Sequence, residues 1–281
     1  RRHTRFRNVT GVQTCALPIS LEPALRALEA NHILYDEVTA ERALASFAAA
    51  EFEADGVPAE FIAVTSGALD GIERLLREHV RPGDRVAVED PCYPGIRDLV
   101  SASGLTAVPM AVDDSGPIPT AMTAAADAGC RAVILTSRAQ NPTGAAITAQ
   151  RARDLRQVLH SRAGVLIIEN DYAAPIAGHA LSPVVGEGHS RWAFVRSCSK
   201  FLGPDLRVAV MTGDEMTVSR VRGRQALGAR WVSHILQRLV LALWSDPSGA
   251  RRLARALEVV SRGDEVRSRD RQCAGIAVGL S

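Results

Sequence analysis

Seven short apolar runs, most of them separated by helix-like stretches, constrain the fold of this chain more than any other feature. Each run is nearly continuous in apolar side chains, which is typical of strands buried on both faces. Strands that alternate with helices favour a parallel sheet. The sequence therefore predicts an α/β fold with a mostly parallel, seven-stranded sheet flanked by helices. The runs lie at residues 61–65, 85–89, 106–112, 131–136, 165–169, 192–197 and 207–212.

Three stretches between or after these runs have the apolar spacing of helices: 66–80, 148–161 and 215–244. The second begins at Thr148, whose hydroxyl suits a helix N-cap. The third contains no proline. We expect it to form one long helix.

The chain divides by composition into a central domain and two atypical ends. Residues 21–260 carry all the strand and helix signals. Residues 1–20 contain arginines and no acid, and the segment VTGVQTCALPIS resembles translated sequencing-adapter read-through. We interpret it as a non-native or disordered segment in preference to an organellar transit segment. Residues 261–281 show no clear strand order, and we expect either the truncated start of a small domain or an irregular tail there.

The charge of the chain is nearly balanced, with 33 basic and 31 acidic side chains and a formal net charge of +2. Such a balance gives no field that would mark a nucleic-acid or membrane-surface binder. No apolar run approaches the roughly 20 residues that cross a bilayer. The cysteines never pair as CxxC, and the histidines have no zinc-site spacing. We expect a cytoplasmic protein with reduced thiols, no metal site and no membrane contact.

Lys200 is the single lysine among the 33 basic residues. A genome rich in G and C explains the abundance of arginine, but it leaves this one lysine unexplained. A guanidinium stays charged, whereas a buried amine can lose its proton. Lys200 is therefore the first candidate for covalent amine chemistry.

Polar loops follow four of the predicted strands, at the edge where ligands bind in open α/β sheets. Taken singly, each loop could be a turn or a solvated strand end. Taken together, they offer an amine, a hydroxyl–arginine anion site, a helix N-terminus and amide or carboxylate groups. That set suits a phosphorylated aldehyde cofactor. The loops are Thr65-Ser66-Gly67-Ala68, Asn141-Pro142-Thr143-Gly144, Glu169-Asn170-Asp171-Tyr172 and Ser197-Cys198-Ser199-Lys200, with Arg207 beyond the last.

The ordered motifs TSGA, DPCYPG, NPTG, ENDY, SCSK and a following arginine resemble the large domain of class I/II aminotransferases, which are fold-type I pyridoxal-phosphate enzymes. The resemblance covers about residues 21–260. VEDPCYPG and SCSKFLGPDLRVAV are most similar to the aminotransferase-like domain of MocR-type transcription regulators. In those regulators the domain follows a winged-helix DNA-binding domain. The family also has a small C-terminal domain, so we expect this chain to be a fragment in which that domain is missing or truncated.

The resemblance implies a role for each matching residue. Lys200 corresponds to the Schiff-base lysine, and with Tyr172 it forms the catalytic pair. Tyr93 corresponds to the aromatic ring stacked on the cofactor. Asn141 and Tyr172 correspond to donors to its phenolic oxygen. The phosphate ligands correspond to Ser66, Gly67, Ala68, Ser197 and Arg207.

One position departs from the family pattern, which places an aspartate against the pyridine nitrogen. Alignment with the Glu-Asp-Asp-Tyr motif of MocR-type regulators puts Asn170 there, although Asp171 is its neighbour. Adjacent strand residues point to opposite faces, so only one of the two can reach the ring. Both remain candidates from the sequence. Asn170 would weaken the electron sink, because an amide carries no charge.

The resemblance implies amino-group transfer between an amino acid and a 2-oxo acid through a Schiff base at Lys200. The alternative is the effector-sensing, pyridoxal-phosphate-binding domain of a MocR-type regulator, with little or no turnover. In either case we expect a small-molecule amino acid or amine as ligand and a homodimer as the assembly. DNA would be bound only through a winged-helix domain outside this chain.

Overall fold

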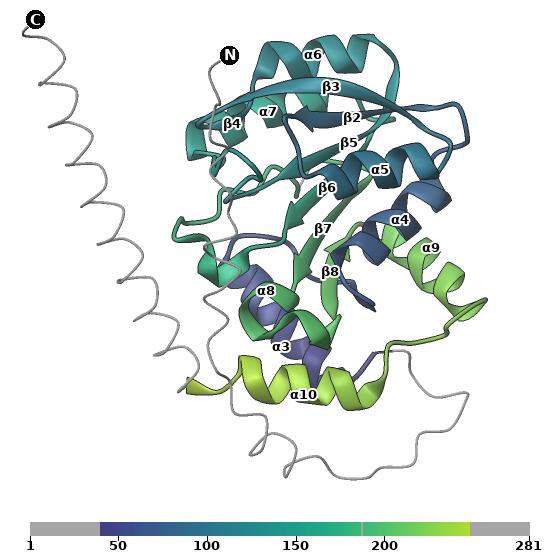
Figure 1. Ribbon diagram of the computed structural model, residues 1–281, viewed down its shortest axis with the longest axis vertical. Coiled ribbons are helices and arrows are strands. Elements are labelled where there is room, and N and C mark those ends of the chain that lie inside the picture. Colours follow the sequence, from purple (N-terminus) through teal and green to yellow (C-terminus); the bar gives the residue numbers. More distant parts are fainter. Residues whose placement is uncertain (1–39, 187, 248–281) are drawn as a thin grey trace, which may run out of the picture.

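A computed structural model describes residues 40–186 and 188–247 and contains one eight-stranded sheet between two layers of helices (Figure 1). The strand order is β1-β8-β7-β6-β5-β2-β3-β4. The strands are β1 Ile62–Thr65, β2 Arg85–Asp90, β3 Thr106–Asp113, β4 Gly116–Pro117, β5 Cys130–Thr136, β6 Leu166–Asp171, β7 Trp192–Ser197 and β8 Ala209–Gly213. The helices are α3 Arg42–Ala54, α4 Ala68–His79, α5 Pro94–Ala102, α6 Pro119–Asp127, α7 Ala149–His160, α8 Ser199–Leu202, α9 Glu215–Ala226 and α10 His234–Trp244, with the 3-10 turns η1 Ala174–Ala177 and η2 Pro204–Leu206.

The predicted α/β class and all seven predicted strands are confirmed, but the sheet has eight strands. The additional strand, β4, is two residues long and pairs antiparallel with the end of β3. Periodicity cannot reveal so short a strand, because it needs several residues. β3 also departs from the expectation of two buried faces, since most of its residues are exposed or half-buried near the edge of the sheet. The predicted segments 1–20 and 261–281 lie outside the described residues.

The predicted long helix over 215–244 is wrong: two helices, α9 and α10, occupy it. The break contains Gly228, and Arg230 has a left-handed backbone with φ 61°. α9 packs on α4, whereas α10 packs on α3, on the other side of the sheet. A continuous helix could cover only one side, so the chain has to turn between them. No helix in the described part of the chain is long and apolar enough to cross a membrane.

The direction of β8 determines which loops meet at one edge of the sheet. β2, β3, β5, β6 and β7 run parallel, whereas β8 is antiparallel to both β7 and β1. The first residue of β8, Ala209, therefore pairs with the last residue of β7, Ser197. The segment that joins them stays at the carboxyl edge. Arg207, predicted as part of the strand, lies just before it, with φ 35°.

Two apolar cores lie on opposite sides of the sheet, and the strand side chains alternate between them. On β7, Phe194 belongs to the core beneath α3 and Val195 to the core beneath α4. On β6, Ile167 faces the α3 side and Ile168 the α4 side. This alternation continues to the end of β6, so the adjacent polar residues Asn170 and Asp171 point to opposite sides of the sheet.

A buried charge cluster lies on the α3 side at the end of β6. Arg138 donates to both carboxylate oxygens of Asp171, at 2.9 and 3.0 Å. Arg196 Nε donates to the same carboxylate at 2.9 Å. The Arg196 guanidinium carbon lies 5.0 Å from the ring centre of Phe52 and 5.5 Å from that of Phe194. The two guanidinium groups compensate for the burial of the Asp171 charge, and the ring faces attract the Arg196 cation.

We predict that Arg196→Ala lowers the free energy of unfolding by about 3 kcal/mol, since it removes one of the two cations from a buried carboxylate. Arg196 also pairs with Asp55. Urea denaturation measures the effect. Arg77→Ala is the matched control, because Arg77 forms an exposed helix pair with Glu73 and its loss should cost under about 0.5 kcal/mol. Equal losses in the two variants would contradict the importance of the cluster.

Candidate functional site

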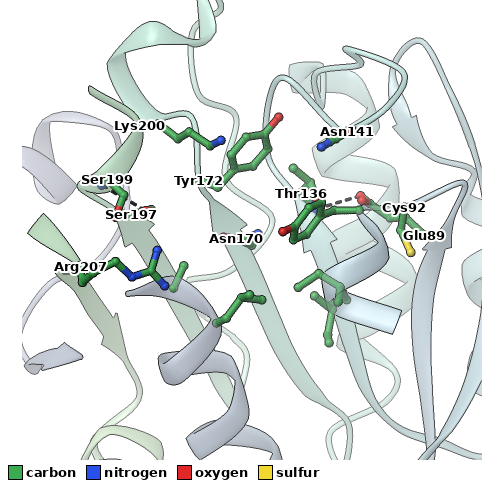
Figure 2. A pocket seen from close by; sticks show the side chains of 15 residues that line it. Glu89, Cys92, Thr136, Asn141, Asn170, Tyr172, Ser197, Ser199, Lys200 and Arg207 are labelled. Atoms are coloured by element: carbon green, nitrogen blue, oxygen red, sulfur yellow. Dashed lines mark hydrogen bonds between the residues drawn. The ribbon is translucent and has the colours of Figure 1, made fainter. Parts of the chain in front are cut away.

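A pocket opens at the carboxyl edge of the sheet, on the side covered by α4 and α5 (Figure 2). Its walls come from the start of α4, the loop between β2 and α5, the ends of β5, β6 and β7, and the segment from α8 to β8. The lining residues are Ala68, Leu69, Glu89, Cys92, Tyr93, Ile96, Ile134, Thr136, Asn141, Asn170, Tyr172, Ser197, Ser199, Lys200 and Arg207. Segments more than 130 residues apart in the sequence therefore form one site.

Most of the sequence-predicted site residues line this pocket, and three do not. Ser66 is exposed before α4, and its backbone N–H donates to Asp70 at 2.9 Å. Gly67 lies behind Arg207, and Asp171 belongs to the buried charge cluster on the other side of the sheet. The predicted residues in the lining are Ala68, Tyr93, Asn141, Asn170, Tyr172, Ser197, Lys200 and Arg207.

The structure decides which of the two neighbours on β6 reaches the pocket. Asn170 shares the α4 side with Ile168, and its side chain lines the pocket floor. Its Oδ1 atom is buried and has no hydrogen-bond partner among the described residues. Asp171 points to the α3 side, where Arg138 and Arg196 bind it. Strand alternation therefore gives the pocket a neutral amide.

Arg207 lies against Gly67 and the start of α4. A Cβ atom on Gly67 would lie 3.2 Å from Arg207 Nη2, so glycine gives the guanidinium room over the helix start. Gly67 is the N-cap of α4 and has φ 99°, which favours glycine. No ion pair or hydrogen bond of the Arg207 guanidinium occurs within the described part of the chain. A free guanidinium beside a helix N-terminus attracts a phosphate or carboxylate.

Two serine hydroxyls also line the pocket, those of Ser197 and Ser199. Ser197 ends β7, and its Oγ accepts a hydrogen bond of 3.3 Å from the Ser199 N–H. Ser199 Oγ is buried and without a partner among the described residues. The sequence reasoning did not select Ser199, although it stands in the SCSK motif. The first turn of α8 carries Ser199 into the pocket, and motif spacing alone does not reveal that turn.

Lys200 stands on α8, opposite the floor residue Asn170 (Figure 2). Its Nζ lies 6.0 Å from the ring centre of Tyr172. Burial lowers the pKa of the Lys200 amine below its ordinary value. A larger fraction of the amine is therefore unprotonated near neutral pH, which is the nucleophilic form.

Tyr172 and Asn141 lie on the side of the pocket away from Arg207 (Figure 2). The Tyr172 hydroxyl donates to the carbonyl oxygen of Ala139. Burial raises the pKa of Tyr172 to about 12, so this hydroxyl keeps its proton at neutral pH. Its hydrogen is engaged with the backbone, and the catalytic role given to Tyr172 from the sequence remains a prediction.

Glu89 is the one acidic side chain in the pocket lining among the described residues, and the sequence reasoning did not select it. The Thr136 N–H donates to Glu89 Oε1 at 2.8 Å, and Gln140 Nε2 donates to Oε2 at 3.2 Å. Burial raises the pKa of Glu89 to about 7. An acid at the end of an apolar strand is a weak signal, because most such acids face solvent.

Glu169 anchors the loop behind the pocket from the α3 side. Ser137 Oγ donates to Glu169 Oε1 at 2.9 Å, and the N–H groups of Val184 and Val185 donate to Oε2 at 2.8 and 2.9 Å. Burial raises the pKa of Glu169 to about 7. Three donors therefore only partly offset the cost of burying its charge.

We predict that Glu169→Gln stabilises the protein at pH 8 but not at pH 5. A carboxyl with a raised pKa gives its full stability below its unfolded-state pKa and loses it as the pH rises to about 7. The amide can accept from both valine N–H groups and donate to the hydroxyl of Ser137. In urea denaturation, the free energy of unfolding of Glu169→Gln should exceed that of the unsubstituted chain by up to about 3 kcal/mol at pH 8, and this difference should shrink toward pH 5. Glu60→Gln changes an exposed carboxyl and should follow the unsubstituted chain; a gap independent of pH would contradict the assignment.

Residues 32–274 match the model of a protein family described as aminotransferase class I and II. Among curated proteins, the chain is 41% identical over 231 residues to the vitamin B6 salvage pathway transcriptional repressor PtsJ of Salmonella typhimurium, across 82% of this chain and 54% of that protein. It is 31% identical over 194 residues to the HTH-type transcriptional regulator TauR of Rhodobacter capsulatus, across 67% of this chain and 38% of the regulator. It is 26% identical over 222 residues to aminotransferase tdiD of Emericella nidulans, across 72% of this chain and 51% of that protein.

Among solved structures, the aspartate aminotransferase from Rhizobium meliloti superimposes with a TM-score of 0.74 at 22% identity, across 83% of this chain and 62% of that one. At this identity the likeness concerns the fold. The chain spans about half the length or less of the three curated relatives.

Proposed function

We infer the function from one premise: this chain belongs to the aminotransferase class I and II family. The cofactor of that family is pyridoxal phosphate. We propose that the pocket binds this cofactor covalently through Lys200 and supports amino-group transfer between an amino acid and a 2-oxo acid. One observation carries the proposal: the chain's single lysine lines the same pocket as Arg207, whose guanidinium has no ion pair or hydrogen bond with residues 40–186 and 188–247.

The residues present fit the phosphate of this cofactor. Arg207 offers two parallel N–H donors, and Ser199 Oγ is a buried hydroxyl without a partner in the described residues. Gly67 leaves space over the N-terminus of α4, where backbone N–H groups point at an anion. The N–H of Ser66 is not available to the phosphate, because it donates to Asp70.

The rest of the pocket fits a flat, polar ring. Tyr93 is the N-cap of α5 and has 48% of its surface exposed, so its ring is available for stacking. Asn141 can donate to an oxygen on the ring side away from Arg207 (Figure 2). When bound, pyridoxal phosphate supplies an aldehyde and a ring that stabilises negative charge on the substrate carbon beside the nitrogen.

Lys200 performs the two steps that the chain itself contributes. Its unprotonated Nζ, favoured by burial, would be the nucleophile that holds the aldehyde of the cofactor. Once a substrate amine had replaced it there, the free Nζ would serve as the base for the proton on the substrate Cα. We expect the ligand to be an amino acid or amine, the assembly a homodimer and the location the cytoplasm.

The second candidate function is ligand sensing in a transcription regulator. The regulators PtsJ and TauR, at 41% and 31% identity, favour it. In that case the same pocket would bind an amine with little turnover. DNA would be contacted through a separate domain.

We predict that incubation with pyridoxal phosphate followed by borohydride attaches one cofactor per chain, at Lys200. Lys200→Ala should lose this adduct, since the only other amine is the α-amino terminus. Intact-mass measurement and peptide mapping read the result. Label on any internal residue of the Lys200→Ala variant would refute the assignment.

We predict that Arg207→Ala weakens the affinity for pyridoxal phosphate by about tenfold or more, because a charge-assisted hydrogen bond to phosphate is lost. Fluorescence titration measures the affinity. Arg131→Ala is the matched control, since Arg131 is an exposed arginine at the opposite end of β5. Equal affinities of Arg207→Ala and the control would argue against an anion site at Arg207.

A further inference from the structure

We propose that Asn170 leaves the ring nitrogen of the bound cofactor unprotonated at neutral pH, so that the site exchanges amines readily but removes the Cα proton slowly. This inference rests on the proposed function, because it requires pyridoxal phosphate in the pocket. It goes beyond that function by assigning Asn170 a role in how far the reaction proceeds.

The Asn170 side chain is available to a ligand. It lines the pocket floor, and its Oδ1 is buried without a partner in the described residues. Thr136 on β5 and Val195 on β7 flank it in the sheet, so its backbone position is fixed from both sides. An amide offers a donor and an acceptor but no charge. It can therefore pair with either protonation state of a ring nitrogen and favours neither by charge.

No free carboxylate faces the same place in the described part of the chain. Both oxygens of Asp171 are bound by arginines on the other side of the sheet. Both oxygens of Glu89 accept hydrogen bonds from β5 and the loop after it. The titratable side chains of the lining are Glu89, Cys92, Tyr93, Tyr172, Lys200 and Arg207.

The covalent structure of the cofactor would place its ring nitrogen on the Asn170 side of the pocket. In pyridoxal phosphate the ring nitrogen is opposite the carbon that carries the aldehyde. An aldehyde held at Lys200 and a phosphate at Arg207 therefore turn the nitrogen away from Lys200. Figure 2 shows Asn170 on the floor across the pocket from Lys200.

The two chemical steps depend differently on that nitrogen. In amine exchange the incoming primary amine bonds to the cofactor carbon, the bond from that carbon to Lys200 Nζ breaks, and both amine protons move to Nζ. This step leaves no charge on carbon. Proton removal from Cα leaves a negative charge on that carbon, and a protonated ring nitrogen is the group that would accept this charge. A carboxylate within about 4–6 Å favours such protonation, whereas an amide does not.

The decisive measurement is the nitrogen NMR spectrum of ring-labelled ¹⁵N-pyridoxal phosphate bound to the full chain at pH 7. We expect the shift of a neutral pyridine in the unsubstituted chain and of a pyridinium in Asn170→Asp. Asp171→Asn should give the neutral shift, since Asp171 faces the charge cluster. Asp171→Asn removes a buried anion and can prevent folding. Asn170→Ala is therefore a second control, and it should also give the neutral shift.

A rate measurement separates the two steps. With Cα-deuterated L-alanine as probe, Asn170→Asp should speed loss of deuterium by at least about tenfold, which corresponds to about 1.4 kcal/mol. Exchange of methylamine with Lys200 should change by less than about twofold. A pyridinium shift in the unsubstituted chain, or deuterium loss unaffected by Asn170→Asp, overturns the inference while the proposed function stands. A chain that takes up no cofactor at Lys200 overturns both.

Discussion

The antiparallel pairing of β8 with β7 is the constraint on which the candidate site depends. β7 ends at Ser197, and β8 begins opposite it at Ala209. The intervening segment cannot cross the sheet, so Lys200 and Arg207 stay at the carboxyl edge. There they meet the start of α4 and the end of β6. If β8 were parallel to β7, a long crossover would have to join them, and β8 would begin at the opposite edge of the sheet.

The alternation of side chains on β6 separates two kinds of polar chemistry. Asp171 and its two arginines lie on the α3 side, where the charges compensate one another. Asn170 lies on the α4 side, in the pocket. The acid that could have served the pocket is thus used for stability. The same strand end carries both roles because neighbouring residues point to opposite faces.

The family is shared by aminotransferases and by transcription regulators, and the described pocket has features that suit both. Lys200, Arg207 and Ser199 line the same pocket, and in the proposed function they would hold the cofactor in an enzyme or in a sensor alike. Asn170 differs in this respect, because it bears on proton removal more than on binding. The rate of Cα proton removal relative to the rate of amine exchange therefore distinguishes an aminotransferase from a sensor for this chain.

The α/β class, seven of the eight strands and about half of the pocket lining could be predicted from the sequence, because apolar runs and ordered motifs are local signals. The sequence also singled out Lys200, through composition alone. It could not predict β4, the break between α9 and α10, or the places of Glu89 and Ser199. The choice between Asn170 and Asp171 required the three-dimensional arrangement of the strands. The register of a strand determines which face of the sheet each of its side chains points to. That register is set by pairing with strands that are distant in the sequence.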